Sequence, residues 1–268
     1  ARGMAIVNLL QLQPGEKISA MVQMREFEDD KYLIMATKQG IIKKTPISAY
    51  TNIRKSGIQA ISLRENDELI DVTISDNTHN IMLITKNGQG IKFRETDVRE
   101  TGRSAMGVKG IELKGNDEVI SMQIDTEGEY ILIVSANGMG KRTPFTEFKL
   151  QNRGGKGVKT LQITEKTGKL IAIKSVTDAN DLMIINRSGL TIRIPVGDIR
   201  LSGRATQGVK VINLRDGDSI ASVIPVPKSD EEEPVGATGT TEEQAGTGGS
   251  VSVDNASQDG NVSTQDNA

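Results

Sequence analysis

The chain has 268 residues, enough for one or two domains with a sizeable core. It has no Cys and one His, which excludes disulfides, thiolate metal sites and multi-histidine metal centres. The net charge is near zero, but residues 228–268 hold one basic and nine acidic residues, leaving 32 basic and 26 acidic residues in 1–227. No run approaches the roughly 20 apolar residues of a membrane span, and no secretory leader opens the chain, so we expect a cytosolic protein.

The chain contains an internal repeat of about 50 residues, visible first as a recurring glycine. Alternating apolar and polar residues follow Gly57, Gly107, Gly157 and Gly208, and another copy follows Gly3. This alternation is typical of β-strands. The other half of each unit has a continuous apolar run and then a turn glycine; the runs cover residues 32–35, 81–84, 130–134 and 182–185.

These patterns predict an all-β, propeller-like fold of four-stranded blades, because no helical period is present. Four full units occupy roughly residues 31–225, and residues 2–27 carry half a unit. We therefore expect residues 1–227 to be one domain, truncated at its N-terminus inside a blade. Residues 228–268 have almost no apolar side chains, so they are expected to form an acidic disordered tail.

One seven-residue run suits contact with a phosphate backbone. Two cations surround a glycine pair, and a third glycine closes the run, which consists of Gln151, Asn152, Arg153, Gly154, Gly155, Lys156 and Gly157. Glycine permits a positive φ and a close approach of the backbone. Exposed amides and cations on such a turn can bind phosphate.

Basic residues recur at two places in the repeat. The first set follows the apolar run and its turn: Lys43, Lys44, Lys92, Arg94, Lys141, Arg142 and Arg193. The second set surrounds the repeat glycine: Arg54, Lys55, Arg103, Lys109, Arg153, Lys156, Lys159, Arg204 and Lys210. Stacked units would place equivalent positions on one rim, so we expect these cations to form a continuous positive band, with the acidic residues mainly in the other hairpin turn. The cations predicted to contact DNA are Lys43, Lys44, Lys92, Lys141, Arg142, Arg153, Lys156, Lys159, Arg193, Arg204 and Lys210.

A curved positive band fits a bent duplex, because neutralising phosphates releases counterions that help to offset the cost of bending. Almost no aromatic residues accompany the cations, which argues against stacking on single-stranded bases. No helix is expected that could enter the major groove. Binding should therefore be directed at the DNA backbone and be weakly selective for sequence.

Several other sites are absent from the sequence. It has no Gly-x-x-x-x-Gly-Lys-Ser/Thr run, so no phosphate loop for ATP is expected. His79 lies in a polar turn and is expected to be an ordinary loop residue. We identify no catalytic residue and no metal ligand set.

The repeats resemble the C-terminal domain of the gyrase A protein of DNA gyrase over about residues 1–226. The run 151–157 resembles the box that marks that protein, and the supporting stretches are residues 2–10, 63–69, 94–99, 140–143 and 206–209. The resemblance implies a six-bladed β-pinwheel with strand exchange between blades, in a bacterial, cytoplasmic, chromosome-associated topoisomerase. It also implies that the domain wraps double-stranded DNA with positive handedness and supports negative supercoiling. The implied partners are the rest of gyrase A, together with gyrase B, in an A2B2 complex; that complex uses ATP and Mg²⁺, whereas no cofactor is expected in this chain.

The chain departs from that family's pattern in several respects. Asn152 stands where the box usually has Arg or Lys, and this box lies in the next-to-last unit rather than in the first blade. The gate tyrosine and the ATPase are not part of this sequence, so a complete activity is not assigned to it. The alternatives are the equivalent domain of topoisomerase IV, whose boxes are fewer or degraded, a propeller that docks proteins, and a sugar-binding or enzymatic propeller.

Overall fold

The computed structural model describes residues 10, 12, 15–24, 28, 30–54, 56–125, 128–215 and 217–228. The chain divides into a unit of residues 1–229 and a unit of residues 230–268, and all described residues lie in the first. The predicted strand copy at Gly3 and nearly all of the predicted acidic tail therefore lie outside the described residues.

The described residues form four antiparallel sheets, which we name A to D. Sheet A has the strand order β3 (Leu69–Ser75), β1 (Tyr32–Thr37), β2 (Ile41–Pro46), β6 (Val108–Lys109). Sheet B has the order β7 (Val119–Ile124), β4 (Asn80–Thr85), β5 (Gln89–Arg94), β10 (Val158–Lys159). Sheet C has the order β11 (Leu170–Val176), β8 (Tyr130–Ser135), β9 (Met139–Pro144), β14 (Val209–Lys210). Sheet D has three strands, β15 (Ile220–Pro227), β12 (Asn180–Asn186) and β13 (Thr191–Pro195).

Helical structure in the described part of the chain is limited to short 3₁₀ turns, which confirms the all-β prediction. Each turn follows the central hairpin of a sheet: η2 (Ile47–Tyr50), η3 (Glu95–Asp97), η4 (Phe145–Glu147) and η5 (Val196–Asp198). Three sheets have the expected four strands, whereas sheet D, predicted as a fourth full blade, has three strands among the described residues.

The outer strand of each four-stranded sheet comes from the following repeat. Strand β6 follows the β4–β5 hairpin of sheet B in the sequence, yet it pairs with β2 of sheet A. Strands β10 and β14 repeat this exchange on sheets B and C. The strand exchange implied by the resemblance is therefore present.

The predicted strands at the repeat glycines are shorter than the alternation suggested. Only two residues of each copy pair as a strand in β6, β10 and β14, and residues 57–63 form no strand. After the two paired residues of β6, the Gly110 amide still donates to Gly40 O in sheet A, and the chain then leaves the sheet, so that the Glu112 amide donates to Gly155 O. The alternation predicted a strand but not the point at which it leaves its partner.

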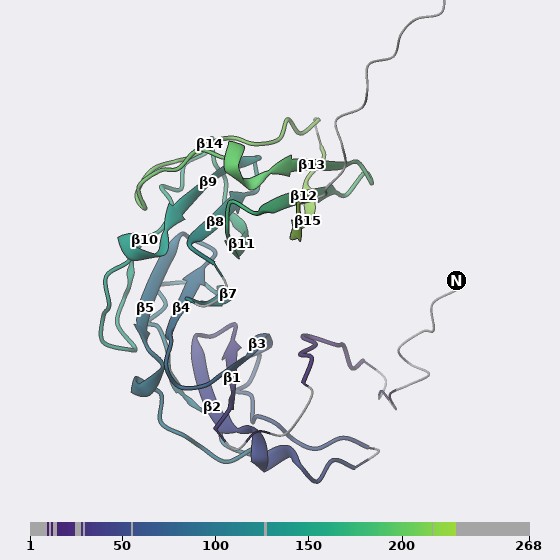
Figure 1. Cartoon of the computed structure of the whole chain (residues 1–268), viewed down its shortest axis with the longest axis vertical. Helices are drawn as coiled ribbons and strands as arrows, with labels where there is room; N and C mark the ends of the chain where they lie inside the picture. Colours follow the sequence, from purple (N-terminus) through teal and green to yellow (C-terminus); the bar gives the residue numbers. More distant parts are fainter. Residues whose placement is uncertain are drawn as a thin grey trace, which may run out of the picture. The chain divides into compact units, whose positions relative to one another are not determined.

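The inner strands join successive sheets. Strand β3 contacts β7, β7 contacts β11, and β11 contacts β15 (Figure 1). Two side chains cross these junctions: Asp71 accepts a hydrogen bond from the Met122 amide at 3.3 Å, and Gln123 accepts one from the Ser175 amide at 2.7 Å. These bonds add polar contacts to the packing between sheets.

The continuous apolar runs are buried on both faces because each of the inner sheets lies between two others. In β4, Ile81 and Leu83 join a core with sheet A, whereas Met82 and Ile84 join a core with sheet C. Successive side chains of a strand point to opposite faces, so a doubly covered strand requires apolar residues at every position. A third core joins sheets C and D.

The acidic turns have a structural role. Asp67 accepts hydrogen bonds from the Thr37 hydroxyl at 2.7 Å and the Gln39 amide at 2.8 Å, so it closes the β1–β2 turn of sheet A. Asp117 and Asp218 accept from the corresponding turns of sheets B and D. These carboxylates therefore stabilise the turns of their sheets.

Candidate nucleic-acid interface

Three equivalent loops carry four cations of the second set: Arg103, Arg153, Lys156 and Arg204. The loops are residues 100–107, 150–157 (the box loop) and 201–208, and each runs from the 3₁₀ turn of one sheet to the outer strand of the preceding sheet. Their first residues form parallel bridges, as Leu150 does with Lys92 in sheet B. The sheet orders place the outer strands at the edge opposite the inner strands, as β10 and β7 show in Figure 1.

The box loop makes the tight turn that its glycines predict. Gly154 and Gly157 have φ of +81° and +69°. A Cβ on Gly157 would lie 2.5 Å from Gly90 O, so only glycine allows the loop to approach sheet B this closely. The Gly154 amide donates to Gly110 O at 2.8 Å, which ties the turn to the chain leaving sheet A.

Arg153 is held by backbone carbonyls rather than by a carboxylate. Its Nε donates to Asp97 O at 2.9 Å, and its Nη1 donates to Lys109 O. Arg204 repeats the second contact one unit later, with Nη1 donating to Lys159 O at 3.1 Å. Carbonyls orient a guanidinium without neutralising its charge, so both arginines keep a positive charge for an anion.

Lysines occupy the same position on the three outer strands. Lys109, Lys159 and Lys210 are exposed, and Lys156 of the box loop is exposed as well. No carboxylate forms an ion pair with these four lysines among the described residues. The outer edges of sheets A, B and C therefore present uncompensated cations at matched places.

One cation in each of sheets A, B and C holds that sheet to the next one: Lys44, Lys92 and Arg142, respectively. Lys44 Nζ donates to Glu95 O at 3.4 Å, and Lys92 Nζ donates to Phe145 O at 3.1 Å, in each case reaching the 3₁₀ turn of the next sheet. Arg142 makes a similar contact with Ile199 O at 2.6 Å and forms an ion pair with Asp178. Each also lies over an aromatic ring, 4.6–5.1 Å from its centroid, which adds a cation–π contact.

Lys43 and Lys141 are fully buried, with 0% of each residue exposed. Lys141 Nζ donates to Gly203 O at 2.8 Å, Arg204 O at 2.6 Å and the Thr206 hydroxyl at 3.3 Å. Lys43 Nζ donates in the same way to Ala60 O and Arg103 O. Burial, and then a nearby arginine, lower the pKa of both ammonium groups to about 8.

The family model for the DNA gyrase C-terminal domain, a β-propeller, matches residues 31–76, 79–124, 129–177 and 180–227. The chain belongs to the DNA gyrase C-terminal domain family. The gyrase A protein of Halalkalibacterium halodurans is 55% identical over 232 residues, covering 87% of this chain and 28% of that protein. The gyrase A protein of Clostridium acetobutylicum is 45% identical over 233 residues, with the same coverage. The chain thus spans about 28% of the length of these relatives.

Solved structures agree with the gyrase-family assignment. The C-terminal domain of DNA topoisomerase IV is similar with a TM-score of 0.78 and 29% identity, covering 84% of this chain and 71% of that one. The C-terminal domain of DNA gyrase A is similar with a TM-score of 0.74 and 27% identity, covering 83% and 75%. The predicted family and fold class are therefore confirmed.

The burial of the first set corrects one expectation for this gyrase-family chain. Lys43, Lys44, Lys92 and Lys141 were expected on an exposed band, but each is at most 9% exposed and donates to backbone carbonyls. Arg142 is half-buried and paired with Asp178. These five cations stabilise the contacts between sheets and loops, so they do not line the outer edge.

Arg193, the last cation of the first set, makes its contacts within its own sheet rather than with a neighbouring one. Its Nε donates to Asp181 at 2.8 Å, and its Nη2 donates to Pro227 O at 2.9 Å, within sheet D. Its side chain is partly exposed, but Asp181 compensates its charge. The residues that remain as candidates for phosphate contact are thus Arg153, Lys156, Lys159, Arg204 and Lys210.

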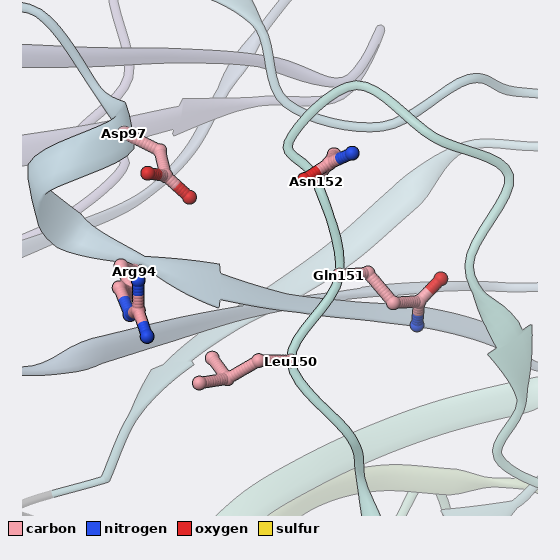
Figure 2. Close-up of a pocket in the computed structure, with 5 residues that line it drawn as sticks. All are labelled: Arg94, Asp97, Leu150, Gln151 and Asn152. Atoms are coloured by element: carbon pink, nitrogen blue, oxygen red, sulfur yellow. The ribbon is translucent and has the colours of Figure 1, made fainter.

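Two further cations of these sets, Lys109 and Arg94, were not among the predicted DNA contacts. Lys109 stands at the same place on β6 as Lys159 on β10 and Lys210 on β14, a match already visible in the aligned repeats. Arg94 ends β5 and lines a pocket with Asp97 and the first residues of the box loop (Figure 2). The sequence distinguishes Arg94 because the other three units have proline at its position.

The described ranges contain no group of three or more His, Cys, Asp or Glu residues that could hold a metal ion. They also contain no helix with the length and apolar character of a membrane span. His79 lies between Asp76 and Asp125, with ring nitrogens 3.1 Å and 3.5 Å from their carboxylates, in the loop where the sequence placed it.

Proposed function

We propose that this chain binds duplex DNA along the outer strands of its sheets and bends it, as the DNA-wrapping domain of a gyrase A protein. Wrapping would support the ATP-dependent introduction of negative supercoils by the whole enzyme. The proposal places the phosphate contacts on six cations of the second set: Lys109, Arg153, Lys156, Lys159, Arg204 and Lys210.

The observation that carries the proposal is the repeated lysine of the outer strands. Lys109, Lys159 and Lys210 occupy equivalent registers on β6, β10 and β14 and carry no compensating carboxylate among the described residues. Hydrogen bonds also join the outer edges of neighbouring sheets: Arg153 donates to Lys109 O, and Arg204 donates to Lys159 O. A duplex following these edges would meet one cation cluster after another.

Backbone contact is the mode of binding that these groups support. Lysines, arginines and glycine amides recognise phosphate oxygens, which carry no sequence information. Smooth bending of a site of 20–30 base pairs costs about 1–6 kcal/mol, so several separate contacts are needed to offset it. The contacts would come from Lys109, Arg153, Lys156, Lys159, Arg204 and Lys210.

The partners of the whole enzyme enter as part of the same proposal. We infer that the chain works with the remainder of gyrase A, and with gyrase B, in an A2B2 complex of the bacterial cytoplasm at the chromosome. ATP and Mg²⁺ would act in the other parts of that complex. The gyrase A relatives, of which this chain covers about 28%, support this inference.

The salt dependence of DNA binding tests the proposal. With 6–10 phosphates engaged, affinity for a duplex should fall by about 10³–10⁵ between 50 and 200 mM salt, as measured by fluorescence anisotropy. Energy transfer between labels at the two ends of the same duplex should rise on binding. A salt-insensitive affinity or an unbent duplex would instead favour a propeller that docks proteins.

The equivalent domain of topoisomerase IV is the second candidate, favoured by the TM-score of 0.78 to such a domain. The intact Arg153-Gly-Gly-Lys156 run favours gyrase. Fused to the core of a gyrase A protein and mixed with gyrase B and ATP, the chain should support negative supercoiling of relaxed plasmid if the gyrase assignment is right. Relaxation without supercoiling would support the topoisomerase IV assignment.

A further inference from the structure

Arg94 lies at the point where sheet B meets the box loop. It is the last residue of β5, and it lines a pocket of about 350 Å³ together with Asp97, Leu150, Gln151 and Asn152. In Figure 2, Arg94 and Asp97 lie on one side, and the three loop residues lie on the other. The guanidinium of Arg94 is on the side of Leu150, whereas the carboxylate of Asp97 is on the side of Asn152.

The other three units have proline at this position. Pro46, Pro144 and Pro195 precede their 3₁₀ turns with φ between −55° and −61° and ψ between 135° and 139°. Arg94 has nearly the same backbone, with φ −71° and ψ 141°. The fold therefore does not require the amide of residue 94, and the arginine side chain is a feature of sheet B alone.

The Arg94 guanidinium is exposed, and it forms no side-chain hydrogen bond or ion pair among the described residues. The buried cations of the first set, in contrast, all donate to protein oxygens. An arginine can offer two parallel N–H groups to a phosphate, and this one is free to do so.

The facing wall of the pocket is formed by the start of the box loop. Gln151 and Asn152 stand there, where the other loops have Thr101 and Gly102, or Ser202 and Gly203. In Figure 2 the Gln151 side chain extends away from Arg94. Arg153 follows in the box loop, and its Nε donates to Asp97 O at the same turn. Sheet B thus adds, beside the box-loop arginine, a guanidinium that sheets A and C lack, since these have Pro46 and Pro144 at the position of Arg94.

We propose that Arg94 contacts a phosphate of duplex DNA at this pocket, between the end of β5 and the start of the box loop. The inference rests on the proposed function and adds a contact point to it. The box loop would then hold the duplex more firmly than loops 100–107 and 201–208, because phosphate is met by cations from two elements instead of one.

Replacing Arg94 with proline tests this site. Arg94→Pro restores the residue of the other three units, so it removes the guanidinium while keeping the backbone geometry. The affinity of the full chain for a duplex should fall about 5–10-fold at low salt, and the slope of log K against log salt should become smaller by about 0.9, the value for one lost phosphate contact.

A matched control removes the same charge elsewhere. Lys114 is exposed in the acidic turn between β6 and β7, and Lys114→Ala should change affinity less than about 2-fold and leave the salt slope unchanged. Equal losses for Arg94→Pro and Lys114→Ala would mean that only net charge matters, and would overturn the site.

Two further measurements separate the possible causes. Unfolding midpoints check that Arg94→Pro is folded, and Arg94→Gln gives the same test if proline proves destabilising. If wild-type chain shows no salt-dependent DNA binding, the proposed function fails. If wild type binds and both Arg94 variants bind equally well, only the Arg94 site is overturned.

Discussion

The box loop and loop 201–208 follow the same course over neighbouring sheets but are held in different ways. Lys141 lies under loop 201–208 and donates three hydrogen bonds to it. Ile91 occupies the corresponding place under the box loop, where the terminal carbon of its side chain is 3.6 Å from the Cβ position of Gly155.

The comparison shows how a lysine and a glycine turn can serve the same purpose. A buried ammonium satisfies inward-facing carbonyls, and the loop can then use ordinary residues such as Ala205. Without that ammonium, the box loop turns at Gly154, whose amide donates to Gly110 O. Arg153 and Arg204 occupy equivalent positions, but a glycine turn holds the loop of Arg153, whereas a buried lysine holds the loop of Arg204.

The largest expected effect comes from removing the Lys141 ammonium that holds loop 201–208. Lys141→Met keeps the apolar stem but removes the ammonium that donates to Gly203 O, Arg204 O and the Thr206 hydroxyl, and we expect a loss of about 3 kcal/mol in the free energy of unfolding. Urea denaturation measures this loss. Lys149→Met, at an exposed lysine, is the control and should stay within about 0.5 kcal/mol of wild type. A similarly small change for Lys141→Met would show that the Lys141 ammonium does not stabilise loop 201–208.

Replacing the loop glycines by alanine should lower the free energy of unfolding by different amounts. Gly157→Ala combines a positive φ with a Cβ 2.5 Å from Gly90 O, so it should cost about 2–3 kcal/mol. Gly154→Ala has the positive φ without a contact below 3.3 Å and should cost about 1–2 kcal/mol. Gly102→Ala, in the lysine-supported loop 100–107, has open space and should be nearly neutral. Thermal unfolding of the three variants should give this order, and equal shifts would contradict the distinction.

The buried lysines also predict a pH dependence. Their pKa values lie near 8 in the folded chain and near the usual 10.5 when it unfolds. Between these values the unfolded chain binds more protons, so the free energy of unfolding should rise with pH from about 8 to about 10.5. Urea titrations at pH 7.5, 9 and 10 (roughly spanning that window) test this, and Lys141→Met should reduce the rise. A flat profile in wild type would contradict it.

DNA bending should distinguish the two loops functionally. Arg153→Ala with Lys156→Ala removes both cations of the box loop and should lower end-to-end energy transfer in a bound duplex more than it lowers affinity. Arg204→Ala in loop 201–208 should lower both by a smaller amount, about 3–5-fold in affinity for one phosphate contact. Unchanged bending in the double variant would remove the box loop from the bending mechanism.

The smallest effect concerns the acidic segment. Residues 228–268 carry nine acidic residues against one basic residue, and we expect them to compete with DNA for the exposed cations of both loops. A chain ending at residue 227 should bind a duplex a few-fold more tightly at low salt. No change in affinity would rule out this competition.

Much of the architecture was predictable because it is encoded locally. The 50-residue period, the apolar runs such as Tyr130–Val134 and the turn glycines are short-range patterns, and the structure confirms the strands and hairpins that they predicted. The box residues likewise indicated a tight turn, which Gly154 and Gly157 form.

The accessible cations could not be identified by the same reasoning. Lys43 and Lys44 look like surface residues in the sequence, but their ammonium groups bind carbonyls of Arg103 and Glu95, more than 50 positions away. A buried charge is tolerated only with such partners, and strand exchange brings them together. The sequence by itself therefore determined the family, the repeat and the kind of charge that recurs, because these depend on neighbouring residues. Only the tertiary structure decided which cations support the fold and which face outward, because that depends on where distant carbonyl groups lie.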